Sequence, residues 1–526
     1  MSTKESTAEF SGWRAALWPI HGYELKKFLP LSFIMFCLLF NYTVLRDTKD
    51  TLVVNSAGAG AITFLKLYCV TPAAILFVLI YAKLTNILRR ETVFYAVVIP
   101  FLVFFGAFAF FIYPNLHMMH PSPETIQSLQ HSYPRLSGFI DIYAYWAFSL
   151  FYVLSEIWGS AMIALMFWQF ANHVVRMRES KRFYGLFAVV GNLALVLSGQ
   201  VVSLSSRYVQ SYFSSKEEAW EVSLFILMGA VVFFGLIAMA LYRWMHSSVL
   251  TDKKFFDVDE QVGKKKKKEK LSLVESAKLI FSSPELGLIA ILIMAYGITI
   301  NLVEVQFKHQ LGLWYAGDKG GYNWFMGQYS TVTGVATIIF GLLAGSNILR
   351  RVSWFNAAII TPTVIAAGGI LFFCFIFSET FVDFVLRNFA TVSTVTAATF
   401  LGAFIVIASK AIKYILFDST KEMAYIPLND ELKTKGKAAV DVIGGRAGKA
   451  GGAFTQSTLL IIFATKDVVS IAPQAFVVFA IVCALWFIAV KILSRKVDEA
   501  VRRQGEAAKS ASSSSGKGAP ETAAAV

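Results

Sequence analysis

Two cations in a glycine-rich segment are the residues of this sequence that most invite a chemical interpretation. The segment, "VIGGRAGKAGGAF" at 442–454, carries Arg446 and Lys449. Glycine-rich loops beside a lysine bind phosphate groups in many nucleotide-binding proteins, because the backbone amides can approach the anion closely. The composition therefore raises the question whether this stretch binds a nucleotide as a P-loop does.

The P-loop interpretation fails on the spacing of the segment. A P-loop has glycine, four residues, and then Gly-Lys-Ser/Thr between a strand and a helix. Here Ile443 stands where the first glycine is required, and Ala450 replaces the hydroxyl residue that ligates magnesium. The small residues favour close helix contact instead, and Arg446 and Lys449, three positions apart, share one helix face.

Further charged residues lie inside apolar surroundings, where a charge is costly unless it faces a partner or a watery cavity. Cations outnumber acids in this set, so we expect an anionic ligand to complete the charge balance. The candidates for binding it are Arg46, Lys49, Lys66, Glu156, Glu304, Lys308, Arg446 and Lys449, with Asp47, Asp50, Lys410, Lys413 and Asp441 nearby in the same apolar segments.

Each of these charges also has a purely structural interpretation. Arg46, Lys49 and Lys308 lie near the ends of apolar segments, and their long side chains could simply reach water. Glu156 and Glu304 lie deeper, where a short acid reaches water less easily. Each could form an ion pair with a basic neighbour or carry a proton, and the sequence does not decide between these two roles.

The composition identifies the surroundings as a lipid bilayer. Of the 526 residues 56% are hydrophobic and only 16% are charged, with 47 phenylalanines. Soluble domains average about 25% charged residues. Because about 20 apolar residues span the hydrocarbon core, we count roughly twelve spans. They lie at 28–50, 61–83, 93–113, 143–170, 184–205, 222–244, 286–308, 322–345, 354–377, 392–417, 438–465 and 472–493.

The loops between the spans are alternately basic and poor in Lys and Arg. The positive-inside rule then places both termini and the central loop, with its lysine run at 264–268, in the cytoplasm. This topology explains most of the net charge of +14 without nucleic-acid binding. No cleavable signal peptide is visible at the N-terminus, and we expect a multi-pass membrane protein.

Other chemistry is not supported by the residue types. The four cysteines fall within predicted spans and are interpreted as packing residues, and the seven histidines lack metal-ligand spacing. We therefore expect no enzyme active site, no metal and no cofactor.

The chain divides into two parts around the basic central loop, with six spans in each. Weak similarities, such as Asn41 before Lys49 and Asn301 before Lys308, suggest a parallel repeat. Two six-helix halves are the plan of major facilitator transporters, so we predict that all-α fold. The predicted parts are a cytoplasmic segment 1–27, a first half 28–244, a linker 245–285, a second half 286–493 and a disordered tail 494–526.

Long motifs in the sequence resemble the ATP/ADP translocases of obligate intracellular bacteria and plastids. They include "NYTVLRDTKDTLVV", "SEIWGSAMIALMFWQFAN", "YGITINLVEVQFK" and "KEMAYIPLNDELKTKGKAAVDVIGGRAGKAGG". The resemblance covers about 20 to about 495 and implies twelve helices and exchange of ATP for ADP. It also implies that Lys49, Glu156, Glu304 and Lys449 match the family's functional charges.

This resemblance leads to a hypothesis for the mechanism. Lysines and arginines from both halves would bind the phosphates, and an empty cavity with unpaired cations would reorient slowly. One-for-one exchange would follow, with phosphate left open as a further substrate. The alternatives are a proton-coupled nucleotide importer, in which Glu156 or Glu304 titrates, and, more remotely, a membrane enzyme acting on phosphorylated lipid.

Overall fold

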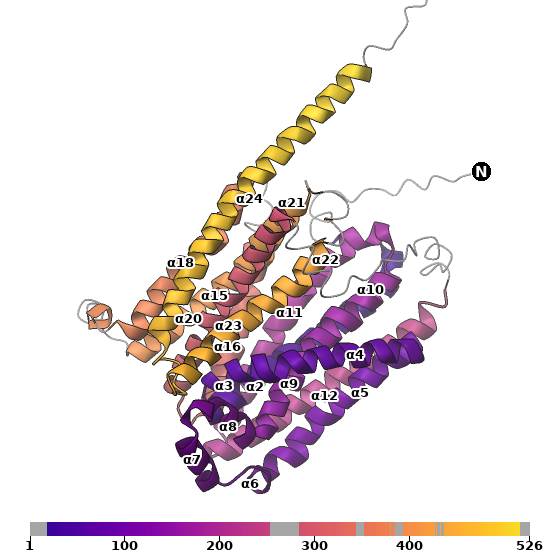
Figure 1. The fold of residues 1–526 in the computed structure, drawn as a ribbon. Helices are drawn as coiled ribbons and strands as arrows, with labels where there is room; N and C mark the ends of the chain where they lie inside the picture. The colour runs from indigo at the N-terminus through magenta and orange to yellow at the C-terminus, as the bar shows by residue number, and fades with distance from the viewer. Residues whose placement is uncertain are drawn as a thin grey trace, which may run out of the picture. The chain divides into compact units, whose positions relative to one another are not determined.

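The computed structural model of the chain is built of helices, and none of the described residues forms a β-strand (Figure 1). It describes residues 18–252, 283–342, 352–378, 380–383, 393–426, 428, 432 and 436–515. Within these ranges, ten helices are long and apolar enough to cross a membrane. The all-α membrane fold predicted from the composition is confirmed.

The ten spans agree with ten of the predicted segments, and the other two segments are helices of lower hydropathy. The first is α16 (Lys319–Phe340), which carries polar residues such as Asn323 and Ser330. The second begins with α22 (Lys437–Ala439) and η10 (Val440–Gly444) and continues as α23 (Gly445–Ile462), which contains Arg446 and Lys449. The total of twelve and the cytoplasmic termini stay predictions.

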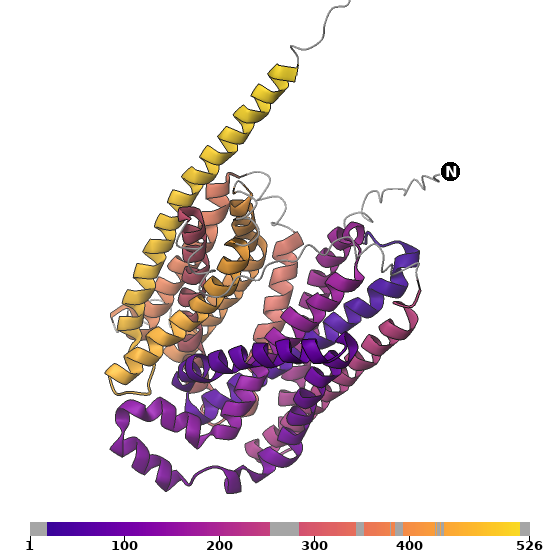
Figure 2. The same ribbon diagram turned by 45° about the vertical axis from the view of Figure 1, so that its right-hand side comes forward.

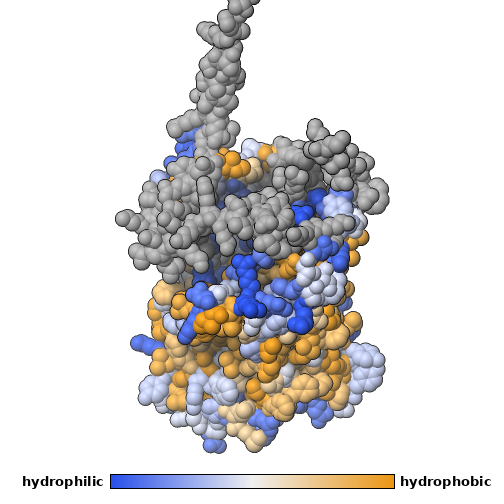
Figure 3. All heavy atoms as spheres, turned by 90° about the vertical axis from the view of Figure 1, so that its right-hand side faces the viewer, coloured by the Kyte–Doolittle hydropathy of each residue, from blue (hydrophilic) through white to orange (hydrophobic). Residues whose placement is uncertain are grey.

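Many large apolar side chains on the spans are exposed, as a lipid-facing surface requires. On α4 (Thr71–Ile87) Leu76 and Leu79 are exposed, and on α12 (Lys216–Ser248) so are Phe233 and Leu236. The face drawn in Figure 3 is largely hydrophobic over its lower part, with hydrophilic residues gathered above. Contact of such surfaces with water would be unfavourable by about 25 cal/mol per Å².

The chain folds into two compact units whose boundaries differ from those of the two predicted halves. Unit 1 is Met1–Lys268, Lys308–Ile338 and Leu460–Val468, and unit 2 is Glu269–Phe307, Ile339–Leu459 and Val469–Val526. Segments of the predicted second half therefore pack with the first half in unit 1. Segment 308–338 packs in unit 1 because α16 makes polar contacts and close glycine contacts with helices of the first half.

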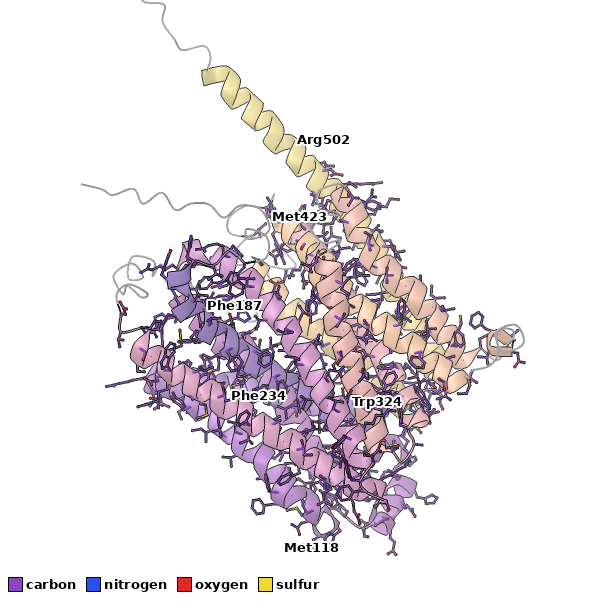
Figure 4. All side chains as sticks on the ribbon, turned by 180° about the vertical axis from the view of Figure 1, so that it is seen from behind. Met118, Phe187, Phe234, Trp324, Met423 and Arg502 are labelled. Carbon is purple, nitrogen blue, oxygen red and sulfur yellow. The ribbon has the colours of Figure 1, made fainter. Side chains whose placement is uncertain are left out.

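Unit 1 contains the helices of the first part of the chain, which include a long first span. They are η1 (Gly22–Glu24), α2 (Leu25–Ala57), α3 (Gly60–Phe64), η2 (Leu65–Val70), α4, α5 (Arg90–Ala107), η3 (Phe108–Ile112), η4 (Tyr113–Asn115), α6 (Leu116–Met119), α7 (Pro123–Ser132), η5 (Pro134–Leu136), α8 (Ser137–Ala144), α9 (Trp146–Trp158), η6 (Gly159–Phe167), α10 (Trp168–Val174), α11 (Met177–Gln210) and α12. Unit 1 also holds α16 and the end of α15 (Pro284–Trp314). Figure 4 places Phe187 of α11 and Met118 of α6 toward opposite ends of this unit.

Helix α2 is the most buried of the ten spans found among the described residues, and it packs against α9, α11 and α12. Aromatic rings fill these contacts: Phe28 stacks on Phe187, and the rings of Phe40 and Phe234 lie 4.2 Å apart. Buried aromatic pairs add stabilisation beyond the area they bury. The helix ends at Gly58, whose positive φ of 81° glycine adopts more readily than other residues.

Close backbone approach and polar contacts hold α16 against α2 and α11 within unit 1. A Cβ added at Gly199 would lie 2.5 Å from the carbonyl oxygen of Gly327. The Thr51 hydroxyl donates to the Asn323 side-chain oxygen at 2.9 Å. At the start of α16 Lys319 pairs with Glu217 at 2.8 Å.

Unit 2 is a bundle of the remaining helices. They are α15 up to Phe307, α18 (Trp354–Phe377), α20 (Thr394–Ile412), η8 (Lys413–Phe417), α21 (Asp418–Tyr425), α22, η10, α23 up to Leu459, and α24 (Ala472–Ser515). Figures 1 and 2 show α24 running well past the other helices of this unit. The tail predicted to be disordered from 494 is therefore helical up to Ser515, because residues 494–509 are rich in helix-forming Ala, Arg, Lys and Glu.

The glycine-rich segment makes the close helix contact that its small residues predict. A Cβ added at Gly297 of α15 would lie 2.8 Å from the Cα of Gly448 of α23, closer than real Cβ atoms approach other atoms. Gln456 of α23 also donates to the Asn301 carbonyl of α15 at 3.3 Å. The two backbones therefore cross in contact in unit 2, and this explains why the segment contains so many glycines.

This crossing gives a prediction about stability. Gly297→Ala should lower the melting temperature of the purified protein in detergent by about 5 °C or more, because the new methyl group meets backbone that cannot move aside. Gly445→Ala is the matched control on α23, since nothing lies within 4 Å of a Cβ there. Equal melting temperatures for the two variants would show that the crossing is not tightly packed.

Candidate functional site

Four charged side chains meet in the interior of unit 1 and form the lysine–carboxylate cluster: Lys49, Asp50, Glu156 and Lys308. The Lys49 Nζ atom lies 2.8 Å from Asp50 Oδ1 and 3.0 Å from Glu156 Oε1. The Lys308 Nζ atom lies 2.8 Å from Asp50 Oδ2. Lys49, Asp50 and Lys308 are almost fully buried, whereas the Glu156 side chain is 25% exposed. The cluster brings together three of the predicted site residues.

Two spans position Lys49. It lies in the second half of α2, and Glu156 lies near the end of α9, which packs against α2. The Trp158 indole donates to the Leu38 carbonyl at 3.2 Å, and a Cβ at Gly159 would lie 2.6 Å from the Tyr42 ring. The indole hydrogen bond and the glycine hold α9 close enough to α2 for Glu156 to reach the lysine.

An aromatic ring completes the surroundings of Lys49. Its Nζ atom lies 3.8 Å from the centre of the Tyr152 ring, and Tyr152 is fully buried. Tyr152 stands one helical turn before Glu156 on α9, so the same face of this helix presents a ring and a carboxylate. A cation over an aromatic face gains about 0.5–2 kcal/mol. Tyr152 is not among the residues predicted from the sequence, although its spacing from Glu156 in "YVLSE" was a usable signal.

Arg46 belongs to a separate network in unit 1. Its Nε atom lies 3.1 Å from Asp47 Oδ1, and its Nη2 atom donates to the Ser330 hydroxyl at 2.7 Å. Ser330 in turn donates to Asp47 Oδ2 at 2.6 Å. These contacts join α2 to α16, so Arg46 has structural partners of its own. Lys66, also predicted as a site residue, lies partly buried in the π-helix η2.

In unit 2 most lysines of the spans also have acidic partners. Glu304 Oε1 of α15 lies 3.6 Å from Lys410 Nζ of α20. Lys413 pairs with Asp418 at 2.8 Å. Lys421 pairs with Asp441 at 3.0 Å. Lys413 and Asp441 lie in the π-helices η8 and η10, and such bulges are frequent where a helix carries function.

Arg446 and Lys449 differ from Lys410, Lys413 and Lys421 of the same unit. Both lie on α23, both are exposed, and neither forms an ion pair with a described residue. They flank Gly448, whose contact with α15 keeps this part of α23 in a fixed place within unit 2. Cations with neither burial nor an acidic partner are available for an anionic ligand.

The structure shows which of the cations counted from the sequence lie beside an acid. Within unit 1, Arg46, Lys49 and Lys308 have acidic partners, which are Asp47, Asp50 and Glu156. In unit 2, Arg446 and Lys449 of the glycine-rich segment form no ion pair with a described residue. No group of metal-binding side chains occurs in the described part of the chain.

Comparison with solved structures shows which known folds the chain resembles. The chain matches a D-xylose–proton symporter with a TM-score of 0.55 and 12% identity, covering 88% of this chain and 96% of that one. It matches a bacterial homologue of the iron transporter ferroportin with a TM-score of 0.52 and 14% identity, covering 89% and 99%. The fold is that of a membrane transporter, as the major-facilitator-like prediction stated.

The family within this class follows from the sequence relatives. Residues 3–497 match the family described as TLC ATP/ADP transporter, and the chain belongs to that family. It is 43% identical to ADP,ATP carrier protein 1 of Rickettsia bellii over 94% of this chain and 98% of that protein. It is also 43% identical to ADP,ATP carrier protein 1 of Chlamydia pneumoniae, covering 94% and 95%. The suspected family is confirmed, and it is a family of transporters rather than enzymes.

The ring beneath Lys49 gives a prediction for transport. Tyr152→Leu should raise the KM for nucleotide uptake into proteoliposomes by roughly threefold to tenfold, because Lys49 loses the aromatic face that helps to hold it. Tyr152→Phe keeps that face and should stay close to the unchanged protein. If Phe impairs uptake as much as Leu does, the hydroxyl matters and not the ring.

Proposed function

We propose that this protein exchanges ATP for ADP across a bacterial inner membrane, importing ATP and exporting ADP. Family membership and the names of its relatives support this substrate pair. The observation that carries the proposal is the exposed cation pair Arg446 and Lys449, which has no acidic partner among the described residues. The relatives' names mention ADP and ATP and not phosphate, so inorganic phosphate is left out of the proposal.

Phosphate groups suit the cations on chemical grounds. A lysine or arginine binds a phosphate oxygen through charge-assisted hydrogen bonds, which are about twice as strong as neutral ones. In this proposal Arg446 and Lys449 of unit 2 are phosphate-binding cations, and within unit 1 Lys49 and Lys308 are candidates for the same chemistry. Glu156 and Glu304 hold lysines in position without contacting the phosphates themselves. The residues proposed from the family resemblance, Lys49, Glu156, Glu304 and Lys449, all have a part in this arrangement.

The ion pairs of unit 1 give a different physical reason for obligatory exchange. The sequence-based hypothesis assumed unpaired cations in the empty carrier, but Lys49 and Lys308 are already paired with Asp50 and Glu156. Separating a buried ion pair costs roughly 3–5 kcal/mol unless another partner replaces the one removed. A nucleotide supplies that replacement, so a loaded carrier can rearrange these pairs while an empty one is held by them.

The same pairs bear on the proton-coupled alternative. Glu156 lies 3.0 Å from Lys49, and Glu304 lies 3.6 Å from Lys410. A carrier that used either acid to carry a proton would have to break that ion pair in each cycle. These contacts therefore favour an exchanger over a symporter.

Exchange can be tested in proteoliposomes that contain the purified protein. Uptake of labelled ATP should rise at least about tenfold when ADP is loaded inside, because the return step needs a nucleotide. An imposed pH gradient without internal nucleotide should give no accumulation. Concentration of ATP on the pH gradient alone would instead establish the proton-coupled importer.

The proposed phosphate-binding role of Arg446 and Lys449 can be tested by removing one of the two charges. Lys449→Gln should lower the rate of ATP–ADP exchange at least about tenfold, since a charge-assisted contact of 1.5–3 kcal/mol is lost. Lys491→Gln is the matched control: Lys491 is also an exposed lysine on a span, on α24, with no ion pair to a described residue. Near-normal exchange by Lys449→Gln would mean that Lys449 only reaches for the membrane surface.

A further inference from the structure

Asp50 lies between two of the proposed phosphate-binding lysines and uses a different oxygen for each. Its Oδ1 atom is 2.8 Å from the Lys49 Nζ atom, and its Oδ2 atom is 2.8 Å from the Lys308 Nζ atom. The carboxylate is 1% exposed, and the two lysine side chains are 2% and 4% exposed. Water therefore does not compete for these ammonium groups, and Asp50 is the anion that the two lysines share.

This arrangement imitates a bound phosphate. A phosphate group also offers two oxygens from one centre, each able to accept from a separate ammonium group. Lys49 comes from α2 and Lys308 from α15, so the shared anion also joins two spans that are distant in the sequence. A phosphate that bound the same two lysines would have to displace Asp50 from at least one of them.

We propose that Asp50 is an internal competitor of the nucleotide's phosphates, which occupies Lys49 and Lys308 until a nucleotide replaces it. This inference rests on the proposed nucleotide exchange and adds a residue that sets its affinity. Asp50 is a positioning residue: it acts through the two lysines and does not contact the nucleotide. Its carboxylate keeps binding weak enough for release, and it holds α2 to α15 when the carrier is empty.

The charges of the cluster show which way the affinity should move. Two lysines face Asp50 and Glu156, so the cluster is neutral as it stands. Asp50→Asn leaves it with one net positive charge and removes a repulsive carboxylate from the place that phosphate takes. Coulomb attraction then strengthens the binding of every nucleotide, and it strengthens the binding of tetravalent ATP more than that of trivalent ADP. A residue with only a structural role would weaken binding when changed and would not shift the preference between the two.

The experiment measures equilibrium binding of labelled ATP and ADP to purified protein in detergent, together with exchange kinetics in proteoliposomes. Asp50→Asn should bind ATP at least about fivefold more tightly, with a smaller gain for ADP, and should exchange with lower KM and lower maximal rate. Asp50→Glu keeps the negative charge and should show no such gain. Unchanged or weaker ATP binding by folded Asp50→Asn overturns the proposal.

A second pair of variants keeps the test valid if Asp50→Asn does not fold. Lys308→Gln leaves the cluster with one net negative charge, and Lys308→Gln combined with Asp50→Asn restores neutrality. The double variant should bind ATP more tightly than Lys308→Gln alone, because only the competitor differs between them. Equal or weaker binding by the double variant overturns the proposal.

Failure of this inference can be told apart from failure of the proposed function. If the unchanged protein binds and exchanges ATP and ADP but the Asp50 variants show no gain in affinity, only the competitor role is wrong. If the unchanged protein neither binds nor exchanges the two nucleotides, the proposed function itself is wrong, and so is the role that rests on it.

Discussion

A lysine buried in an apolar helix bundle stays charged only if other groups replace the water that it has lost. In this protein the replacement comes from carboxylates on the same and on neighbouring spans, and from an aromatic ring. Lys49 has Asp50, Glu156 and the face of Tyr152, and Lys308 shares Asp50. Because each partner lies on a particular helix, the requirement to neutralise these cations also dictates how α2, α9 and α15 pack within unit 1.

The same requirement recurs in unit 2 with a different outcome. Lys410, Lys413 and Lys421 each have an acid within 4 Å, whereas Arg446 and Lys449 have none among the described residues. These described residues are thus of two kinds. One kind is paired with an acid and must exchange that partner to bind an anion, and the other is exposed and ready to bind one. A carrier of ATP and ADP needs both properties, since it must attract a phosphate chain and also release it.

Glycine has a supporting part in this arrangement. Gly297 and Gly448 let α15 and α23 cross with their backbones in contact, and Gly199 and Gly327 do the same for α11 and α16. Hydrogen bonds then form across contacts that larger side chains would hold apart, such as the one from Gln456 to Asn301. The glycine-rich segment that resembles a phosphate loop at first sight is therefore a helix-packing surface that carries two cations.

The sequence alone was enough to predict the class of fold and the family. Apolar segments of about 20 residues can only be membrane helices here, because a bilayer requires every backbone hydrogen bond to be made within the segment. The long motifs around Lys49, Glu156, Glu304 and Lys449 were sufficient to suggest the transporter family. The functional role of these four charges is implied by the resemblance and stays a prediction. Helix positions followed closely as well, apart from the tail, where α24 continues to Ser515.

Only the tertiary structure decided which charges meet. Sequence analysis could count cations and acids in the spans, but a count does not pair residues that are far apart in the chain. Lys308 reaches Asp50 across 258 positions of sequence, from number 308 to number 50, and Tyr152 lies beneath Lys49 because α9 packs on α2. The pairing of Lys49 and Lys308 with one shared carboxylate, Asp50, became visible for this reason. Ion pairing depends on distances of a few ångströms, and those distances are set by helix packing.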